Sequence, residues 1–265
     1  MNSAEIDALF AQTLVGDIDA DEPWEAVRQL RENGNREIFD RASAWCESDD
    51  PIKRARGADV LCQLLRKTMV QGIGQWENIF RDEAYAPITR MLENEQNPIV
   101  LRSAIFALGH LCNPEGIPLV LRHQDHQDKE VRFAVACALG SFANDARSVA
   151  TLVKLTRDSD ADVRDWAVFG LGVIGDADTP EIREALVRCL GDANEDVAEE
   201  AACGLGKRHD QRVIPKLLAM LDDSELSPRA QETVASLLGL DWADLDKWTP
   251  TECRAALADK FNLRR

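Results

Sequence analysis

The sequence lacks the short motifs that mark common enzyme active sites. Its 265 residues contain no G-x-S-x-G nucleophile elbow, no P-loop and no H-E-x-x-H zinc motif. Gly170, Gly172 and Gly175 match the spacing G-x-G-x-x-G, but we expect them inside and at the end of a packed helix. A dinucleotide site needs a strand, a turn and then a helix at that point. The sequence therefore predicts no catalytic residue and no cofactor, and it indicates a protein without enzymatic activity.

Basic residues are in short supply. The chain has 31 Lys and Arg against 47 Asp and Glu, which gives a net charge of −16. Nucleic acids and anionic membranes attract proteins through a basic face, so this balance argues against both as main partners. Two interpretations remain: a protein partner with a basic surface, or a charge that serves only to keep the protein in solution.

Export and membrane signals are also missing. The N-terminal segment MNSAEIDALFAQ has no basic stretch and no long apolar run, so we expect no signal peptide, and no other segment is apolar enough to span a bilayer. The seven cysteines are an odd number without a C-x-x-C pair, and most fall within apolar helical stripes. Buried free thiols in a reducing cytoplasm are therefore predicted.

What the chain does have is an internal repeat. Residues 158–175 read DSDADVRDWAVFGLGVIG, an acidic turn followed by Val-Arg and an apolar helix, and near-copies occupy 96–109, 128–140 and 194–206. Successive Leu-Gly ends, from Gly109 to Gly239, lie 31, 32, 34 and 33 residues apart. A fixed period in this range is typical of stacked helix pairs. The predicted fold class is all-α, a right-handed superhelix of about seven helix pairs.

We expect one solenoid over residues 1–265, in which 1–34 form an N-terminal capping pair, 35–239 the repeats and 240–265 a C-terminal cap. A long step between the second and third pairs places an insertion at 70–85. Ser3 is the expected N-cap of the first helix, Pro23 and Pro87 are expected to begin helices, and Thr249 with the proline after it is expected to begin the last helix.

Small and charged residues have structural interpretations within the repeat. Ala167 and Gly170 lie on the apolar face of their helix, where small side chains let neighbouring helices approach closely. The turn acids precede helix N-termini, where their charge meets the free N–H groups. Arg132 and Arg164 occupy one slot of the repeat, and we expect this slot to form a ladder of ion pairs to turn aspartates.

The pattern D-x-x-V-R-x-x-A-x-x-x-L-G resembles the HEAT-repeat family, in its short PBS-lyase-like form, over residues 20–240. Within that family the chain is similar to bacterial HEAT proteins encoded in Rhs toxin elements. The stretches that carry this likeness are VRDWAVFGLGVIGDADTPEIREALVRCLGDANEDV, GLGKRHDQRV and the insertion after the second pair. The resemblance implies an immunity or inhibitor protein that binds and blocks a toxin domain.

The candidate binding site is the concave side of the solenoid, which the second helices line in HEAT stacks. One outward slot of each repeat differs from copy to copy and carries aromatic residues flanked by charges of both signs, which makes it a candidate binding surface. The alternative is that the phenylalanines are half-buried between helices. Trp166 falls at the edge of the core and is expected to pack there. The predicted partner-binding residues are Arg102, Phe106, Phe133, Asp165, Phe169 and Glu199.

Acidic residues recur at the turns and define a candidate edge that would steer a basic partner, although helix capping and solvation explain each of them singly. The members are Asp49, Asp50, Asp158, Asp160, Asp162, Asp192, Glu195, Asp196, Glu199, Glu200, Asp222, Asp223 and Glu225.

Two histidines offer a weak metal candidate. His123 and His126 stand with two aspartates in the run HQDHQD, although a polar loop is the favoured interpretation and no metal site is predicted.

The family that this chain resembles has two enzymatic branches. A di-iron hydroxylase of deoxyhypusine uses a series of His-Glu pairs, whereas this chain contains no His-Glu dipeptide and only four histidines. A lyase-like HEAT protein acting on a bound chromophore or small ligand stays open as the alternative to a protein-binding scaffold, since its active residues are poorly defined by motif.

Overall fold

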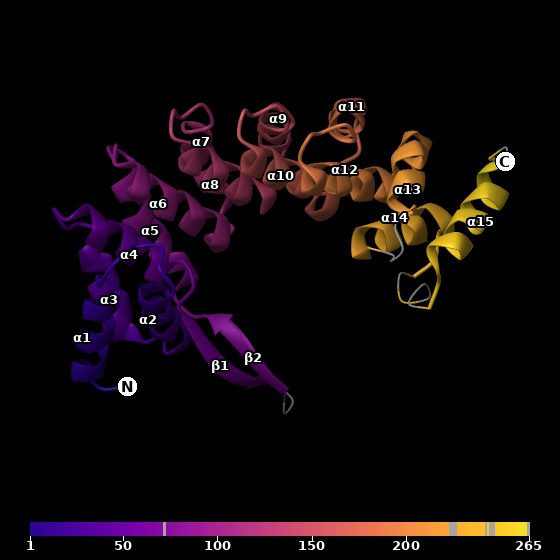
Figure 1. Ribbon diagram of the computed structural model, residues 1–265. Helices are drawn as coiled ribbons and strands as arrows, with labels where there is room; N and C mark the ends of the chain where they lie inside the picture. The colour runs from indigo at the N-terminus through magenta and orange to yellow at the C-terminus, as the bar shows by residue number, and fades with distance from the viewer. Residues whose placement is uncertain (71–72, 223–226, 242, 244–246, 264–265) are drawn as a thin grey trace. The chain divides into compact units, whose positions relative to one another are not determined.

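Helices dominate the chain, as the repeat predicts (Figure 1). The computed structural model describes residues 1–70, 73–222, 227–241, 243 and 247–263. They fall into two units, Met1–Ser141 and Phe142–Arg265, and each unit is a stack of helix pairs. The all-α solenoid fold class is thus confirmed, with one addition in the first unit.

Five helices of the first unit begin after a capping side chain. The N-terminus of α1, α3, α4, α6 and α8 is preceded by an Asn or Asp whose side chain accepts a backbone N–H of the first turn. The elements in order are α1 (Ser3–Gln12), α2 (Asp21–Glu32), α3 (Arg36–Trp45), α4 (Pro51–Leu61), α5 (Arg81–Leu92), α6 (Pro98–Leu111), a 3-10 turn at Pro114–Gly116, α7 (Ile117–Leu121) and α8 (Lys129–Gly140).

The addition is an antiparallel hairpin between α4 and α5. Strand β1 (Leu65–Val70) pairs with β2 (Ile73–Asn78), so the predicted insertion starts earlier than residue 70, and its last part is already helical. The extended chain is fixed at its base, because Leu65 O accepts a hydrogen bond from Gly34 N at 3.2 Å and Leu64 O accepts one from Ile79 N at 3.1 Å. Part of the predicted insertion, residues 71 and 72, lies outside the described residues.

Three predicted helix starts in the first unit were wrong. The N-cap of α1 is Asn2, whose side chain accepts Glu5 N while the Glu5 carboxylate accepts Asn2 N, a reciprocal pair that Ser3 does not make. Pro23 is the third residue of α2. Pro87 lies inside α5, which begins at Arg81 with two acidic residues in its first turn, where they suit the helix N-terminus.

The second unit arranges its helices in two layers. In Figure 1 the first helices of the pairs, α9 (Ala146–Leu155), α11 (Pro180–Cys189) and α13 (Ile214–Met220), lie along one side. The second helices, α10 (Ala161–Phe169), α12 (Glu195–Lys207) and α14 (Pro228–Leu238), lie along the other. A π-helical turn at Gly170–Ile174 continues α10. Helix α15 (Pro250–Phe261) ends the described fold, and Thr249 caps it as predicted.

Close approach of the second helices is confirmed at their glycines. A Cβ added to Gly204 would lie 2.6 Å from Gly172 Cα, and one added to Gly109 would lie 2.8 Å from Ala138 Cα. Since real Cβ atoms do not come this near, only glycine permits these contacts. The small residues of the repeat therefore set the spacing between neighbouring pairs.

Arginines tie successive repeats together. Arg164 makes a two-pronged ion pair with Asp192, with both N–O distances 2.8 Å, and Arg54 reaches Glu95 at 2.8 Å. The predicted ladder from arginine to turn aspartate is confirmed at Arg164–Asp192, and Arg54–Glu95 is a similar contact that was not predicted.

The guanidinium of Arg208 lies buried at the end of α12. It donates to five backbone carbonyls, of which Leu171, Gly172, Gly175 and Ala177 belong to the preceding repeat and Gly204 to its own. These contacts satisfy carbonyl groups that the π turn and the helix end leave open.

None of the described helices is both long and apolar enough to cross a membrane. The seven cysteines, all within the described residues, form no disulfide; five are buried, Cys137 is half-buried and Cys112 is exposed.

Candidate functional site

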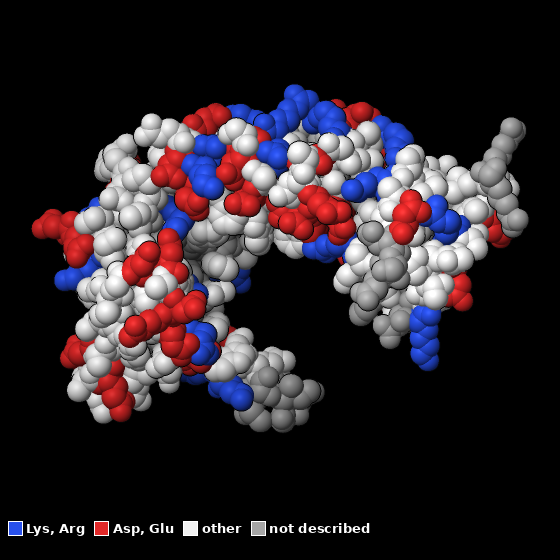
Figure 2. Space-filling model, in the orientation of Figure 1, with Lys and Arg blue, Asp and Glu red and all other residues white. Residues whose placement is uncertain are grey.

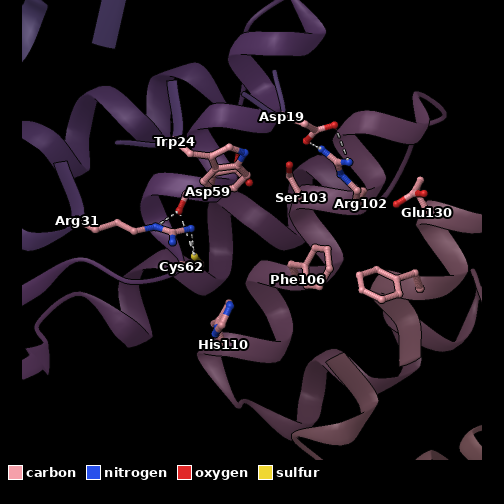
Figure 3. Close-up of a pocket in the computed structure, with 11 residues that line it drawn as sticks. Asp19, Trp24, Arg31, Asp59, Cys62, Arg102, Ser103, Phe106, His110 and Glu130 are labelled. Carbon is pink, nitrogen blue, oxygen red and sulfur yellow. Dashed lines mark hydrogen bonds and ion pairs between the residues drawn. The ribbon is translucent and has the colours of Figure 1, made fainter. Parts of the chain in front are cut away.

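In the first unit the predicted contact residues gather around one pocket of about 340 Å³ (Figure 3). Arg102 and Phe106 come from α6, and Phe133 comes from α8. The rings of Phe106 and Phe133 meet edge to face with their centroids 6.0 Å apart. Three of the six predicted residues thus share a site. The full lining is Asp19, Trp24, Arg31, Asp59, Cys62, Arg102, Ser103, Phe106, His110, Glu130 and Phe133.

Arg102 is held in place rather than free at the rim. Its Nη2 donates to Asp19 Oδ1 at 2.5 Å and its Nη1 to Asp19 Oδ2 at 3.2 Å, and only 17% of its side chain is exposed. Asp19 lies in the turn between α1 and α2, so the N-terminal pair reaches over to α6 and forms one wall of the pocket. From the sequence, this pair was expected only to cap the stack, and Asp19 and Trp24 were not predicted as site residues.

A buried ion pair lies behind the pocket. Arg56 is fully buried; its Nη1 donates to Asp59 at 3.1 Å and its Nε to Thr13 O at 3.0 Å. The Trp24 ring lies 4.9 Å from the Arg56 guanidinium and 5.7 Å from that of Arg31. Burial raises the pKa of Asp59, which the positive charge of Arg56 lowers in part. These groups fix Trp24 as a rigid aromatic wall.

The titratable groups of the pocket favour binding over covalent chemistry. Burial raises the pKa of the Cys62 thiol to about 11, so it is protonated at neutral pH and is a poor nucleophile. Burial and the nearby Arg31 lower the pKa of His110, whose Nδ1 lies 3.2 Å from Gln63 Nε2. The pocket therefore offers aromatic walls and fixed charges, which suit recognition of a side chain.

In the second unit the other three predicted residues lie on α10 and α12. Phe169 is half-buried and meets the Trp166 ring edge to face at 5.5 Å, while the Arg229 guanidinium lies 5.9 Å from the Phe169 centroid. Trp166 is 36% exposed and packs against Phe169, so it lies at the edge of the core, as expected. Of these two rings, the one that Arg229 approaches is that of Phe169.

Carboxylates crowd this part of the second unit. Burial raises the pKa of Asp165, and Asp196 adds to that rise; burial also raises the pKa of Glu199, with help from Glu195. Figure 2 shows acidic side chains concentrated over α12. Glu199 and Glu200 lie within α12 rather than at a turn, so they are not part of the predicted acidic edge, and Asp223 and Glu225 lie outside the described residues.

Sequence reasoning placed Glu200 only on the acidic edge and missed its partner in this unit, Arg229. Glu200 is 7% exposed and forms an ion pair with Arg229 of α14. The signal was present: Glu200 occupies the slot that holds Ser103, Ala134 and Trp166 in the other copies. A charge in a slot otherwise small or aromatic is a local exception to the repeat, and such exceptions concentrate at functional positions.

The two candidate histidines do not form a metal site with the aspartates around them. The ring centroids of His123 and His126 are 6.4 Å apart, and His126 Nδ1 accepts a hydrogen bond from Asp128 N at 3.1 Å. Across the described parts of the chain, no three His, Cys, Asp or Glu side chains come together as metal ligands.

Comparison with known proteins gives the family. A model described as HEAT repeats matches residues 85–172 and 149–238. Protein YibA of Escherichia coli K12 is 29% identical over 198 residues, which is 72% of this chain and 66% of YibA. The X-ray structure of Escherichia coli YibA superposes with a TM-score of 0.72 at 23% identity, covering all of this chain and 93% of the other, and supports the same fold. The chain belongs to the HEAT repeat family.

Proposed function

We propose that this protein is a non-enzymatic binding scaffold that grips a protein partner along its second helices. Repeat solenoids present extended surfaces to their partners, and their fold alone does not choose the partner. The observation that carries the proposal is the pocket of the first unit, where Phe106 and Phe133 converge with a fixed Arg102. Preformed aromatic pockets ringed by charge are where interfaces concentrate binding energy.

The size and chemistry of the pocket support a side-chain anchor. Its volume, about 340 Å³, is at the lower end of the range for small-ligand sites. The walls Trp24 and Arg102 are held by Arg56 and Asp19, so few side chains lose conformational freedom when a partner binds. A large side chain from a partner fits this description.

A partner with a basic surface matches the charge. The net charge of −16 speeds encounter with a basic protein and slows it with an acidic one. The resemblance to HEAT proteins of Rhs toxin elements supports a finer proposal, an immunity or inhibitor protein that occludes a toxin domain in the cytoplasm. Inhibition then follows from covering the toxin's basic surface, without any catalytic step by this protein.

The test is affinity capture from native cell extract followed by purification of the captured protein. Phe133→Ala and Phe169→Ala should each weaken its binding at least about tenfold if the rings are anchors. Phe261→Ala, on α15, is the matched control and should leave binding unchanged. Circular dichroism melts verify that each variant is folded.

Two results would contradict the proposal. Unchanged affinity in both folded variants would show that the partner does not bind through Phe133 and Phe169, and that the predicted binding surface is wrong. Failure to capture any protein, together with a clear thermal shift from a tetrapyrrole or other small ligand, would favour the lyase-like alternative instead.

A further inference from the structure

The second helices of the second unit hold more negative charge than they neutralise. Asp165 of α10, Glu200 of α12 and Glu232 of α14 face one another closely enough that the charges of Asp165 and Glu232 both act on the Glu200 carboxyl. The cation among them is Arg229, which pairs with Glu200 and approaches Glu232 at 3.5 Å. Three carboxylates thus surround one guanidinium.

Two of the carboxylate oxygens are buried and without a partner. Glu200 is 7% exposed; its Oε1 accepts from Arg229, whereas its Oε2 makes no hydrogen bond. Oδ1 of Asp165 is likewise buried and makes none. An ionised carboxylate accepts up to about four hydrogen bonds, and a buried oxygen that accepts none is costly. Such atoms in a native protein call for an explanation, and a missing donor is the direct one.

The same face offers an aromatic surface to a cation. Trp166 is 36% exposed and meets Phe169 edge to face, and the Arg229 guanidinium already lies 5.9 Å from the Phe169 ring. Aromatic rings attract guanidinium groups through their quadrupole. The internal arginine therefore demonstrates the chemistry that this face accepts: a planar cation between a carboxylate and a ring.

We propose that Asp165 and Glu200, with Trp166 beside them, form a receptor for one arginine side chain of the protein partner. The inference rests on the proposed function for the partner's being a protein. A guanidinium carries paired N–H donors in a fork that satisfies two carboxylate oxygens at once, which a compact ammonium does not. A metal ion is disfavoured because the described residues bring no three suitable ligands together.

Binding should tighten as pH rises through neutrality. Burial raises the pKa of Glu200 to about 7, against the opposing effect of Arg229, so this carboxyl is about half protonated in the free protein at neutral pH. The groups that face it are Asp165 from α10 and Arg229 and Glu232 from α14. An arriving guanidinium binds the ionised form and must displace the proton, so occupancy and ionisation rise together.

The direct test is carbon-detected NMR of the side-chain carboxyls during titration with the tripeptide acetyl-Gly-Arg-Gly-amide. The carboxyl signals of Asp165 and Glu200 should shift saturably, and the apparent pKa of Glu200 should fall in the presence of the tripeptide. The same tripeptide with citrulline in place of arginine keeps the shape without the charge and should produce neither effect.

Variants separate this site from the general acidity of the protein. Glu200→Gln and Asp165→Asn should each weaken tripeptide binding at least about tenfold. Glu184→Gln makes the same chemical change on α11, the other helix of the pair, where the side chain is 59% exposed, and should leave binding unchanged. Equal losses in all three folded variants, or equal shifts with citrulline, would overturn the proposal.

The captured partner decides whether the site or the function has failed. If the partner binds Glu200→Gln and Asp165→Asn as tightly as the parent protein, the arginine receptor is wrong and the scaffold function stands. If no protein partner exists although the tripeptide binds saturably, the site is a guanidinium receptor and the scaffold function is wrong.

Discussion

Replacing Glu200 with glutamine should stabilise the folded protein, and more so as pH rises. Burial raises the pKa of this carboxyl from 4.5 to about 7 in the folded state. A raised folded-state pKa favours folding fully below the unfolded pKa, and this contribution is lost as pH rises through the folded pKa. With about 1.4 kcal/mol for each pKa unit, the loss reaches roughly 3 kcal/mol above neutral pH.

The glutamine side chain reproduces the shape of protonated Glu200 and keeps an oxygen that accepts from Arg229, so it removes this loss. We expect the variant to exceed the parent in unfolding free energy by about 1 kcal/mol at about pH 5.5 and about 3 kcal/mol at about pH 8.5. The measurement is urea denaturation followed by circular dichroism at both pH values. Comparing the two proteins cancels the titration of the groups that do not interact with Glu200.

Glu184→Gln is the control, since it makes the same chemical change at a side chain that is 59% exposed. The reasoning would be refuted if Glu200→Gln were less stable than the parent at the higher pH, or if its advantage were the same at both. Either outcome would mean that Glu200 ionises in the folded protein at no cost in stability without an additional donor. The proposed arginine site would then lose its support.

Three further predictions concern the scaffold. Gly204→Ala should destabilise by about 1–3 kcal/mol, since its Cβ would meet Gly172 Cα at 2.6 Å, whereas Gly191→Ala, with its nearest atom 4.0 Å away, should be close to neutral in the same denaturation assay; equal effects would contradict the packing argument. Arg208→Lys should cost about 2–4 kcal/mol because an ammonium cannot reach five carbonyls, and an unchanged melting curve would show that they are satisfied otherwise. In the native protein a thiol reagent should label exposed Cys112 well before Cys62, whose burial raises its pKa to about 11. Mass spectrometry of peptides measures the order of labelling, and labelling of Cys62 first would contradict the prediction.

The repeat was readable from the sequence because its signals are local. Leu-Gly ends and Asp or Asn caps recur from copy to copy, and the Val-Arg slot is kept in two copies; together they predicted the helix pairs, the close glycine contact and the Arg164–Asp192 rung. The hairpin was not readable in the same way. Strand β1 follows directly on an apolar helix and contains no turn residue, and its backbone is fixed by a partner distant in sequence, Gly34.

The candidate sites were only half predictable for the same reason. Comparing copies at two outward positions, four residues apart in each repeat, identified Phe106, Phe133 and Phe169, because that comparison needs only the period. The partners of these residues come from other helices: Asp19 lies 83 residues from Arg102, and Arg229 lies 29 from Glu200. Nothing local in the sequence indicates such pairs, although the charge at Glu200 was visible as an exception within its own slot.

Arg208 has a consequence for how this protein can be cut and recombined. Four of the five carbonyl groups that it binds belong to the preceding repeat, so one repeat supplies the cap of another. A fragment that ends between Lys207 and Arg208 would keep helices α10 and α12 whole, but those carbonyl groups would lose the hydrogen bonds from Arg208. Truncations and chimaeras should therefore have their boundary after Asp210, which accepts a hydrogen bond from Arg183, as does the backbone carbonyl of Arg208. The Leu-Gly boundary that the period indicates is the wrong place for such a cut. The modules that evolution or a designer can exchange are thus offset from the modules that the sequence displays.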